Sequence, residues 1–117
     1  MKTIKENSTN QFNKENVINK CPVSHTLGKI GGRWKPLILW SLSNAEKMRY
    51  SEIKRSIPAI TEKMLIQHLR ELEQDNLIIR KSLPVVPPYV EYKLSESGKE
   101  MEPILSAMAD WGLKYVG

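Results

Sequence analysis

Cysteine and long apolar runs are both scarce in this sequence of 117 residues. The single cysteine, Cys21, excludes an internal disulfide framework, so a cytoplasmic location is the simplest expectation. No stretch of about 18 apolar residues is present, so we expect no membrane span. The polar residues 1–16 lack the apolar segment that a signal peptide requires.

Motifs of enzymes and metal sites are also missing. The glycines do not form a dinucleotide-binding or phosphate-binding loop, and no zinc-protease or nucleophile-elbow motif occurs. The only cysteine and histidines, Cys21, His25 and His68, are too few and too scattered for a structural metal site. We therefore expect neither an enzyme nor a bound metal or cofactor.

Basic residues are concentrated in the middle of the chain. The formal net charge is +5. Between Lys29 and Lys93, twelve Lys and Arg stand against seven Asp and Glu, whereas residues 94–117 hold two Lys against four acidic residues. A basic middle suits a polyanionic partner such as nucleic acid. The length is that of one domain with one core.

The first half of the chain is predicted to contain a flexible arm and two helices. The polar residues 1–20 predict the arm. Pro22 suits the first position of a helix with Cys21 as its N-cap, and Gly31 and Gly32 end that helix. A second helix is predicted over residues 34–42, where the apolar residues are too dense for a one-sided surface helix.

A helix-turn-helix is predicted next. Residues 48–50 are expected to form a short isolated strand, and Ser51 is expected to cap a helix that ends at Ile57. Ile53 and Ile57 face inward. Residues 58–60 make a tight connection to a helix over residues 61–75. Two short helices joined in this way are typical of a helix-turn-helix.

The helix over residues 61–75 has one apolar face, formed by Leu65, Leu69 and Leu72 at the helical period, with Thr61 as its N-cap. Its opposite face carries polar groups that can hydrogen-bond base edges in a DNA major groove. The alternative is an ordinary amphipathic helix with a solvated outer face. The residues of the polar face are Lys63, Gln67, Arg70 and Gln74.

A β-hairpin is predicted after this helix. Asn76 suits the left-handed conformation that ends a helix, and strands are expected over residues 77–81 and 90–94. The prolines between them cannot donate to a strand ladder, so residues 83–89 form the tip. A hairpin beside a helix-turn-helix makes a wing. The predicted fold class is mainly α with a small β-hairpin (α+β), a winged helix-turn-helix.

A final helix is predicted over residues 95–116, with apolar residues at spacings of three and four. Because the preceding helices already supply a core, we expect this face to pack against the same helix of a second copy and form a homodimer. Folding back onto its own domain is the alternative. The predicted interface residues are Met101, Ile104, Leu105, Met108, Trp111 and Tyr115.

Five sequence blocks in this order carry a resemblance to a known family: CPV, IGGRWKPLIL, MRYSEIKRSIPAITEKML, LRELEQDNLI and VPPYVEYKLSESG. Together they resemble the HxlR-type winged-helix transcription regulators, which are related to the MarR regulators. The resemblance covers the chain from Cys21 to Tyr115. It implies that residues 21–117 form a homodimeric domain that binds operator DNA near its target promoters.

The resemblance also assigns DNA contacts by position. Glu62 can accept a hydrogen bond from a cytosine amino group or serve as a favourable charge at a helix N-terminus. Arg70 can contact phosphate or pair with Glu73. Each backbone candidate can instead be solvated surface. The base-reading candidates are Thr61, Glu62, Lys63, Met64 and Gln67, with Lys63 and Gln67 preferred. The phosphate-backbone candidates are Arg33, Lys35, Arg49, Lys54, Arg55 and Arg70.

The wing departs from the family pattern. Family members usually carry a basic residue between the two prolines and the VEY triplet, where this chain has Tyr89. A phenol cannot replace an arginine in a narrow, electronegative minor groove. Either Lys81 or Lys93 supplies the charge of the wing, or the wing contributes little. The candidate wing residues are Lys81, Pro87, Pro88, Tyr89 and Lys93.

Cys21 is the candidate sensing residue. A thiol at a helix N-terminus has a lowered pKa, and a protonated His25 one turn away would lower it further. The family includes thiol-based sensors of oxidants and electrophiles with a cysteine here, so an electrophile or another small molecule is a candidate effector. Alkylation, a mixed disulfide and a bridge between the two Cys21 residues of a dimer are the available reactions. The alternative is a small buried apolar residue.

A winged-helix module that binds protein rather than DNA is the main functional alternative. Such a module would keep the fold but lose the basic face along Lys54, Lys63 and Arg70, and that face is present in this sequence.

Overall fold

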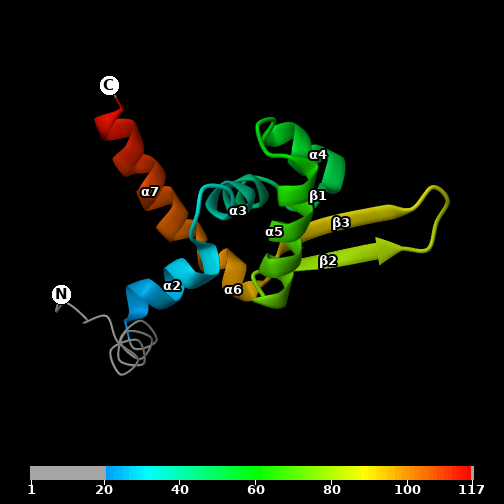
Figure 1. The fold of residues 1–117 in the computed structure, drawn as a ribbon, viewed down its shortest axis with the longest axis horizontal. Helices are drawn as coiled ribbons and strands as arrows, with labels where there is room; N and C mark the ends of the chain where they lie inside the picture. Colours follow the sequence, from blue (N-terminus) through cyan, green and yellow to red (C-terminus); the bar gives the residue numbers. More distant parts are fainter. Residues whose placement is uncertain (1–20, 117) are drawn as a thin grey trace, which may run out of the picture. The chain divides into compact units, whose positions relative to one another are not determined.

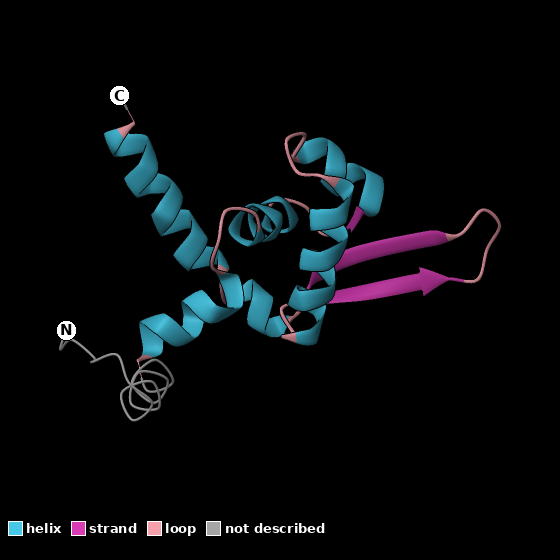
Figure 2. Cartoon of the chain, viewed as in Figure 1, coloured by secondary structure: helices cyan, strands magenta, loops and turns pink. Residues whose placement is uncertain are grey.

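The computed structural model describes residues 21–116 (Figures 1 and 2). The chain divides into two units, one ending at Gly31 and the other beginning at Gly32. The described part of the first unit is α2 (Pro22–Ile30). The predicted flexible arm of residues 1–20 lies outside the described residues. The second unit contains α3 (Lys35–Ser43), β1 (Met48–Arg49), α4 (Tyr50–Ser56), α5 (Glu62–Gln74), β2 (Ile78–Leu83), β3 (Tyr89–Leu94), α6 (Glu96–Lys99) and α7 (Glu102–Tyr115).

α2 begins and ends where the sequence predicts. Pro22 lies in its first turn, and Cys21 is the N-cap with an extended backbone. The N–H of Gly31 donates to the Leu27 carbonyl at 2.7 Å, and Gly31 then leaves the helix in an extended conformation.

α3 supplies the buried centre of the second unit. Ile38, Leu39 and Leu42 are fully buried, which confirms the prediction from its dense apolar run. Pro36 lies in the first turn, where its missing N–H would have had no partner inside the helix.

α4 and α5 form the helix-turn-helix. α4 begins at Tyr50, so the prediction of Ser51 as its cap is wrong. Arg49 takes that place with an extended backbone, and its N–H donates to the Glu52 carboxylate at 2.7 Å. Thr61 caps α5 as predicted, because its Oγ1 accepts from the Met64 N–H at 3.1 Å. The buried residues through which the helix-turn-helix packs onto the core are Ile53, Ile57, Ile60, Leu65, Leu69 and Leu72.

The sheet has three antiparallel strands in the order β1-β3-β2. The prediction that this strand is isolated is therefore wrong, because β1 pairs with β3 and Arg49 lies opposite Glu91. The β2–β3 hairpin extends beyond the helices of this unit (Figure 1). Tyr89 pairs with Leu83 inside the ladder, so the tip is residues 84–88 rather than 83–89.

The link between α5 and β2 lies close to α6. Asn76 has a φ of 61°, as predicted for the residue that ends a helix. Gly98 is buried in α6, and a Cβ at this position would overlap the carbonyl oxygen of Leu77. The close approach of the two backbones therefore requires glycine at position 98.

The C-terminal helix is interrupted, so the prediction of one helix over residues 95–116 is wrong. α6 ends at Lys99 and α7 begins at Glu102. Pro103 has no N–H to donate to the carbonyl of Lys99, four residues earlier, so a continuous helix would lose that bond. Within residues 21–116, no helix is both long and apolar enough to cross a membrane.

Candidate nucleic-acid interface

The outward face of α5 is the candidate reading surface. Thr61, Glu62, Lys63 and Gln67 are exposed on the first turns, whereas Met64 is half-buried. The Thr61 oxygen is occupied as the cap of the helix, although its hydroxyl hydrogen is still available to a base or phosphate oxygen. The structure thus brings four of the five base-reading candidates to one solvent-facing surface.

Glu71 organises the polar groups behind this surface. Its carboxylate lies 2.8 Å from the Lys35 ammonium of α3 and accepts from the Gln67 amide at 3.3 Å. His68 Nδ1 lies 3.4 Å from the same carboxylate. The Lys35 hydrogen bond, followed by that of Gln67, lowers the pKa of Glu71 to about 2. Gln67 is therefore held in place by a carboxylate that stays ionised at neutral pH.

The prediction that Lys35 contacts the phosphate backbone is wrong. Its side chain is only 12% exposed and its ammonium pairs with Glu71, so it joins α3 to α5 instead of offering a free charge to DNA phosphate. The charge partner could not be seen in the sequence, because Glu71 is on a different helix.

The remaining phosphate candidates are in different surroundings. The Arg33 guanidinium lies 4.4 Å from the centre of the Trp34 ring. The Lys54 ammonium donates to the Pro58 carbonyl at 3.3 Å, which ties α4 to the turn before α5. Arg55 and Arg70 are exposed, and no ion pair joins Arg70 to Glu73 in the described chain.

Arg49 and Tyr89 bring a cation to the wing. The guanidinium carbon of Arg49 lies 4.6 Å from the centre of the Tyr89 ring. β1 pairs with β3, and this pairing sets Arg49 opposite Glu91, two residues along β3 from Tyr89 at the tip end of the strand. The position that lacks a basic side chain in the sequence therefore has a guanidinium stacked upon it from another strand.

Lys81 and Lys93 lie on one face of the hairpin. Lys81 is opposite Glu91 and Lys93 is opposite Ile79, and alternation along the strands places these pairs on the same side. Glu91 also receives the Lys47 ammonium at 3.6 Å. This face is mixed in charge. Pro87 and Pro88 are exposed in the tip.

Arg80 is a further basic residue of the wing that the sequence pattern did not single out. It pairs with Tyr92 on the opposite face of the hairpin, the face that also carries the buried Ile78. Arg80 and Arg70 of α5 line one hollow of about 340 Å³ with Ile66, Glu73 and Tyr92. Alternation within the predicted strand over residues 77–81 already places Arg80 on the same side as Ile78, but the sequence does not show that this side meets α5.

α7 presents an apolar surface. Met101 and Leu105 are buried, 8% and 4% exposed, so their assignment to a dimer interface is corrected: they belong to the core of the chain itself. Leu105 and Met108 also line an apolar hollow of about 250 Å³ with three residues of α3, Pro36, Leu37 and Trp40. The interface candidates that remain exposed are Ile104, Met108, Trp111 and Tyr115.

Comparisons with known proteins agree with this architecture. Residues 29–117 match the model of the HxlR-like helix-turn-helix family. The chain belongs to the HxlR family. The regulatory protein MalR of Fusobacterium mortiferum is 52% identical over 80% of this chain and 88% of its own length.

Solved structures of similar chains have the same fold. The HTH-type transcriptional regulator YtcD is 49% identical, with a TM-score of 0.77 over 82% of this chain and 97% of its own. The redox regulator HypR in its oxidised form is 42% identical, with a TM-score of 0.78 over 83% of this chain and 99% of its own. The winged helix-turn-helix predicted for this chain is thus confirmed. The HxlR family consists of transcriptional regulators rather than enzymes.

Cys21 of this HxlR chain is half-exposed at the start of α2. Its side chain makes no capping hydrogen bond, yet the backbone N–H of Ser24 lowers the pKa of the thiol, and the Ser24 hydroxyl adds to this effect. The direction agrees with the expectation for a thiol at a helix N-terminus, and the groups that lower the pKa are those of Ser24 in the first turn. In residues 21–116, no three potential metal ligands come together.

Proposed function

We propose that this HxlR-family chain is a transcriptional regulator that binds double-stranded operator DNA sequence-specifically as a homodimer. The observation that carries the proposal is the exposed polar face of α5, with Lys63, Gln67 and Arg70 outward and three leucines buried beneath. A helix with this face fits the width of a B-DNA major groove.

The roles of the residues follow from their positions. Lys63 and Gln67 read base edges, with Thr61, Glu62 and Met64 beside them on the leading turns. Arg33, Arg49, Arg55 and Arg70 contact the phosphate backbone, and Lys54 shares its charge with the turn that it braces. Arg80 joins this set, because it faces the same hollow as Arg70.

The homodimer forms through α7 in this proposal. Ile104, Met108, Trp111 and Tyr115 lie at helical spacing, and Trp111 is 68% exposed. The rings of Trp111 and Tyr115 pack at a tilt of 42° with their centres 5.0 Å apart, which gives the surface a continuous aromatic end. A second copy of the same helix would cover this stripe, and two-fold symmetry would present one α5 to each half-site of an operator.

A salt titration of binding to the DNA upstream of the chain's own gene tests the proposal. Affinity should fall steeply with ionic strength, and Arg70→Gln should reduce the slope of log K against log salt by about 1. Lys114→Gln, which removes an equal charge from α7, is the matched control and should leave the slope unchanged. No retardation of DNA at low salt would favour a protein-binding winged-helix module instead.

Footprinting on the same DNA separates reading from general attraction. Gln67→Ala should relax the preference at one base position by about 1–3 kcal/mol while binding to unrelated DNA stays constant. An equal loss on every DNA sequence would assign Gln67 to the backbone rather than to a base.

A second function, thiol-based sensing, has support from Cys21. Its thiol is half-exposed with a lowered pKa, and the similar protein HypR is described as a redox regulator. A thiolate adds to a quinone directly, or forms a disulfide with a small thiol or the partner's Cys21 while diamide is reduced to the hydrazine. Either product adds bulk or a cross-link at the start of α2.

Treatment with a quinone or diamide, followed by measurement of operator affinity, tests the sensing function. The wild type should change its affinity and Cys21→Ser should not. Equal responses of the two proteins would reject Cys21 as the sensor without affecting the assignment of DNA binding.

A further inference from the structure

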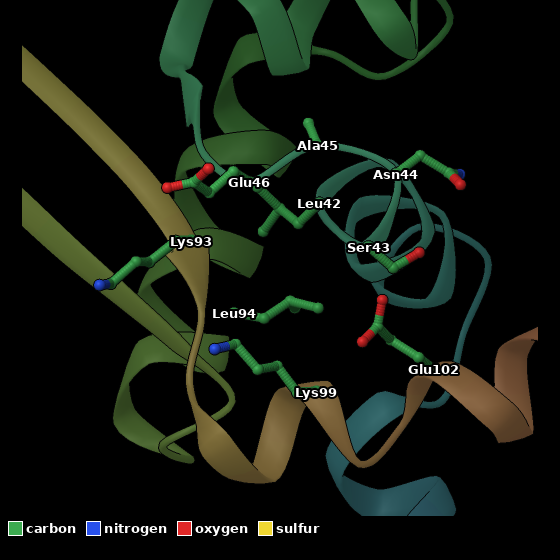
Figure 3. A pocket seen from close by; sticks show the side chains of 9 residues that line it. All are labelled: Leu42, Ser43, Asn44, Ala45, Glu46, Lys93, Leu94, Lys99 and Glu102. Atoms are coloured by element: carbon green, nitrogen blue, oxygen red, sulfur yellow. The ribbon is translucent and has the colours of Figure 1, made fainter.

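A hollow of about 380 Å³ lies between the C-terminal end of α3, the end of β3, and the junction of α6 with α7 (Figure 3). Its floor is formed by Leu42 and Leu94, which are 1% and 5% exposed. The volume falls within the range of about 300–1,000 Å³ that is typical of small-molecule sites. None of the side chains assigned to base reading lines this hollow.

One side of the hollow offers two hydrogen-bond acceptors, Ser43 and Glu102. The Ser43 hydroxyl donates to the Trp40 carbonyl at 2.8 Å, so its oxygen is left as an acceptor. The Glu102 carboxylate turns toward the same space (Figure 3), and no cation of the described chain pairs with it. The C-terminal end of α3 adds the negative end of a helix dipole. This side therefore favours an ammonium group.

The other side offers a cation. Lys99 of α6 extends along the floor beside Leu94, away from Glu102 (Figure 3). Its only ion pair in the described chain is a long one, 3.9 Å from the exposed Glu96 carboxylate. Exposed pairs of this kind contribute little to stability, so the ammonium is available to a ligand. Glu46 and Lys93, which complete the rim, point their charged ends away from the hollow (Figure 3).

We propose that this hollow binds a small zwitterion, with its ammonium group between Ser43 and Glu102 and its carboxylate on Lys99. The apolar floor accepts the carbon chain between the two charges. The bound molecule would link the end of β3 to the first turn of α7. Binding of the zwitterion does not depend on the proposed function. Any effect of the zwitterion on regulation rests on that function, because β3 belongs to the wing and α7 to the proposed dimer surface.

Titration of the full chain with δ-aminovalerate, followed by NMR, tests the site. The zwitterion should shift the backbone amides of Ser43, Leu94 and Lys99, and Lys99→Gln or Glu102→Gln should each weaken binding by about tenfold or more. Valerate and pentylamine, which each carry one of the two charges, should bind more weakly by a similar factor. Glu100→Gln removes a neighbouring carboxylate outside the hollow and should leave the affinity unchanged.

Three results would overturn the proposal. They are no shift at these amides, equal affinity in the wild type and both charge variants, or equal binding of a single-charge relative. The first result is expected if Lys99 closes onto Glu102 and fills the hollow. Because the titration is made on the free protein, it succeeds or fails independently of DNA binding.

Discussion

The guanidinium of Arg49 lies over the ring of Tyr89, with 4.6 Å between the Arg49 carbon and the ring centre. The two residues come from β1 and β3, which are adjacent in the sheet although far apart in the sequence. The contact gives the wing a positive charge at a position where its own strand provides a phenol. A guanidinium on an aromatic ring keeps its outer N–H groups free for phosphate or a groove edge.

Replacement of Arg49 should therefore weaken DNA binding through the wing. Arg49→Gln should reduce the salt slope by about 1, whereas Tyr89→Leu keeps the charge, loses its platform, and should cost about 0.5–1 kcal/mol. Arg49→Lys retains the charge but cannot stack as a plane on Tyr89. Its DNA affinity should therefore lie between that of Arg49→Gln and that of the wild type. Fluorescence anisotropy on one operator measures all three, and full affinity of Arg49→Gln would show that the wing cation does not touch DNA.

The Lys35–Glu71 pair should make stability depend on acid pH. The pKa of Glu71 is lowered from 4.5 to about 2, so its contribution is complete above the unfolded pKa and is lost as pH falls through the folded one. Glu71→Gln should be less stable than the wild type at neutral pH, and the two should converge between pH 4.5 and about 2. Urea unfolding at several pH values measures this. Glu73→Gln, on the same helix but with no ion pair among residues 21–116, should keep the same pH dependence of stability as the wild type.

Loss of the Thr61 cap should destabilise α5. Thr61→Ala leaves the Met64 N–H without its acceptor and should lower the free energy of unfolding by about 1 kcal/mol. Thr61→Ser retains the hydroxyl and should remain near the wild type. Denaturant melts of the three proteins are sufficient, and an unchanged midpoint for the alanine variant would mean that solvent replaces the cap without loss.

Charge on the exposed stripe of α7 should separate the proposed dimer. Trp111→Glu should sediment as a monomer, whereas Leu113→Glu, an exposed residue on another side of the same helix, should not change the mass. A wild-type chain that sediments as a single subunit would contradict the dimer.

Truncation of a buried residue of α7 should destabilise the fold itself. Leu105→Ala should lower the free energy of unfolding by about 2–5 kcal/mol, because it leaves a cavity in the core.

Short-range patterns in the sequence determined much of the fold. The spacing of Leu65, Leu69 and Leu72, the Thr61 cap and the Asn76 ending placed α5 nearly to the residue, because these features act within one or two turns. The outward position of Lys63 and Gln67 followed from them, and the tight connection at residues 58–60 and the hairpin prolines completed the winged helix-turn-helix. The prediction of α6 and α7 as one helix was wrong. Pro103, which causes the interruption, was nevertheless visible in the sequence.

Tertiary structure alone decided which charges have partners and which apolar residues are left over. Lys35 resembled any surface cation until α3 placed it against Glu71, and Arg80 gained its neighbour Arg70 only when the hairpin met α5. Met101 and Leu105 proved to be core, while Ile104 and Met108 stayed exposed on the same helix. Periodicity fixes the face of an element on which a side chain lies, but the partner of that face is set by long-range packing.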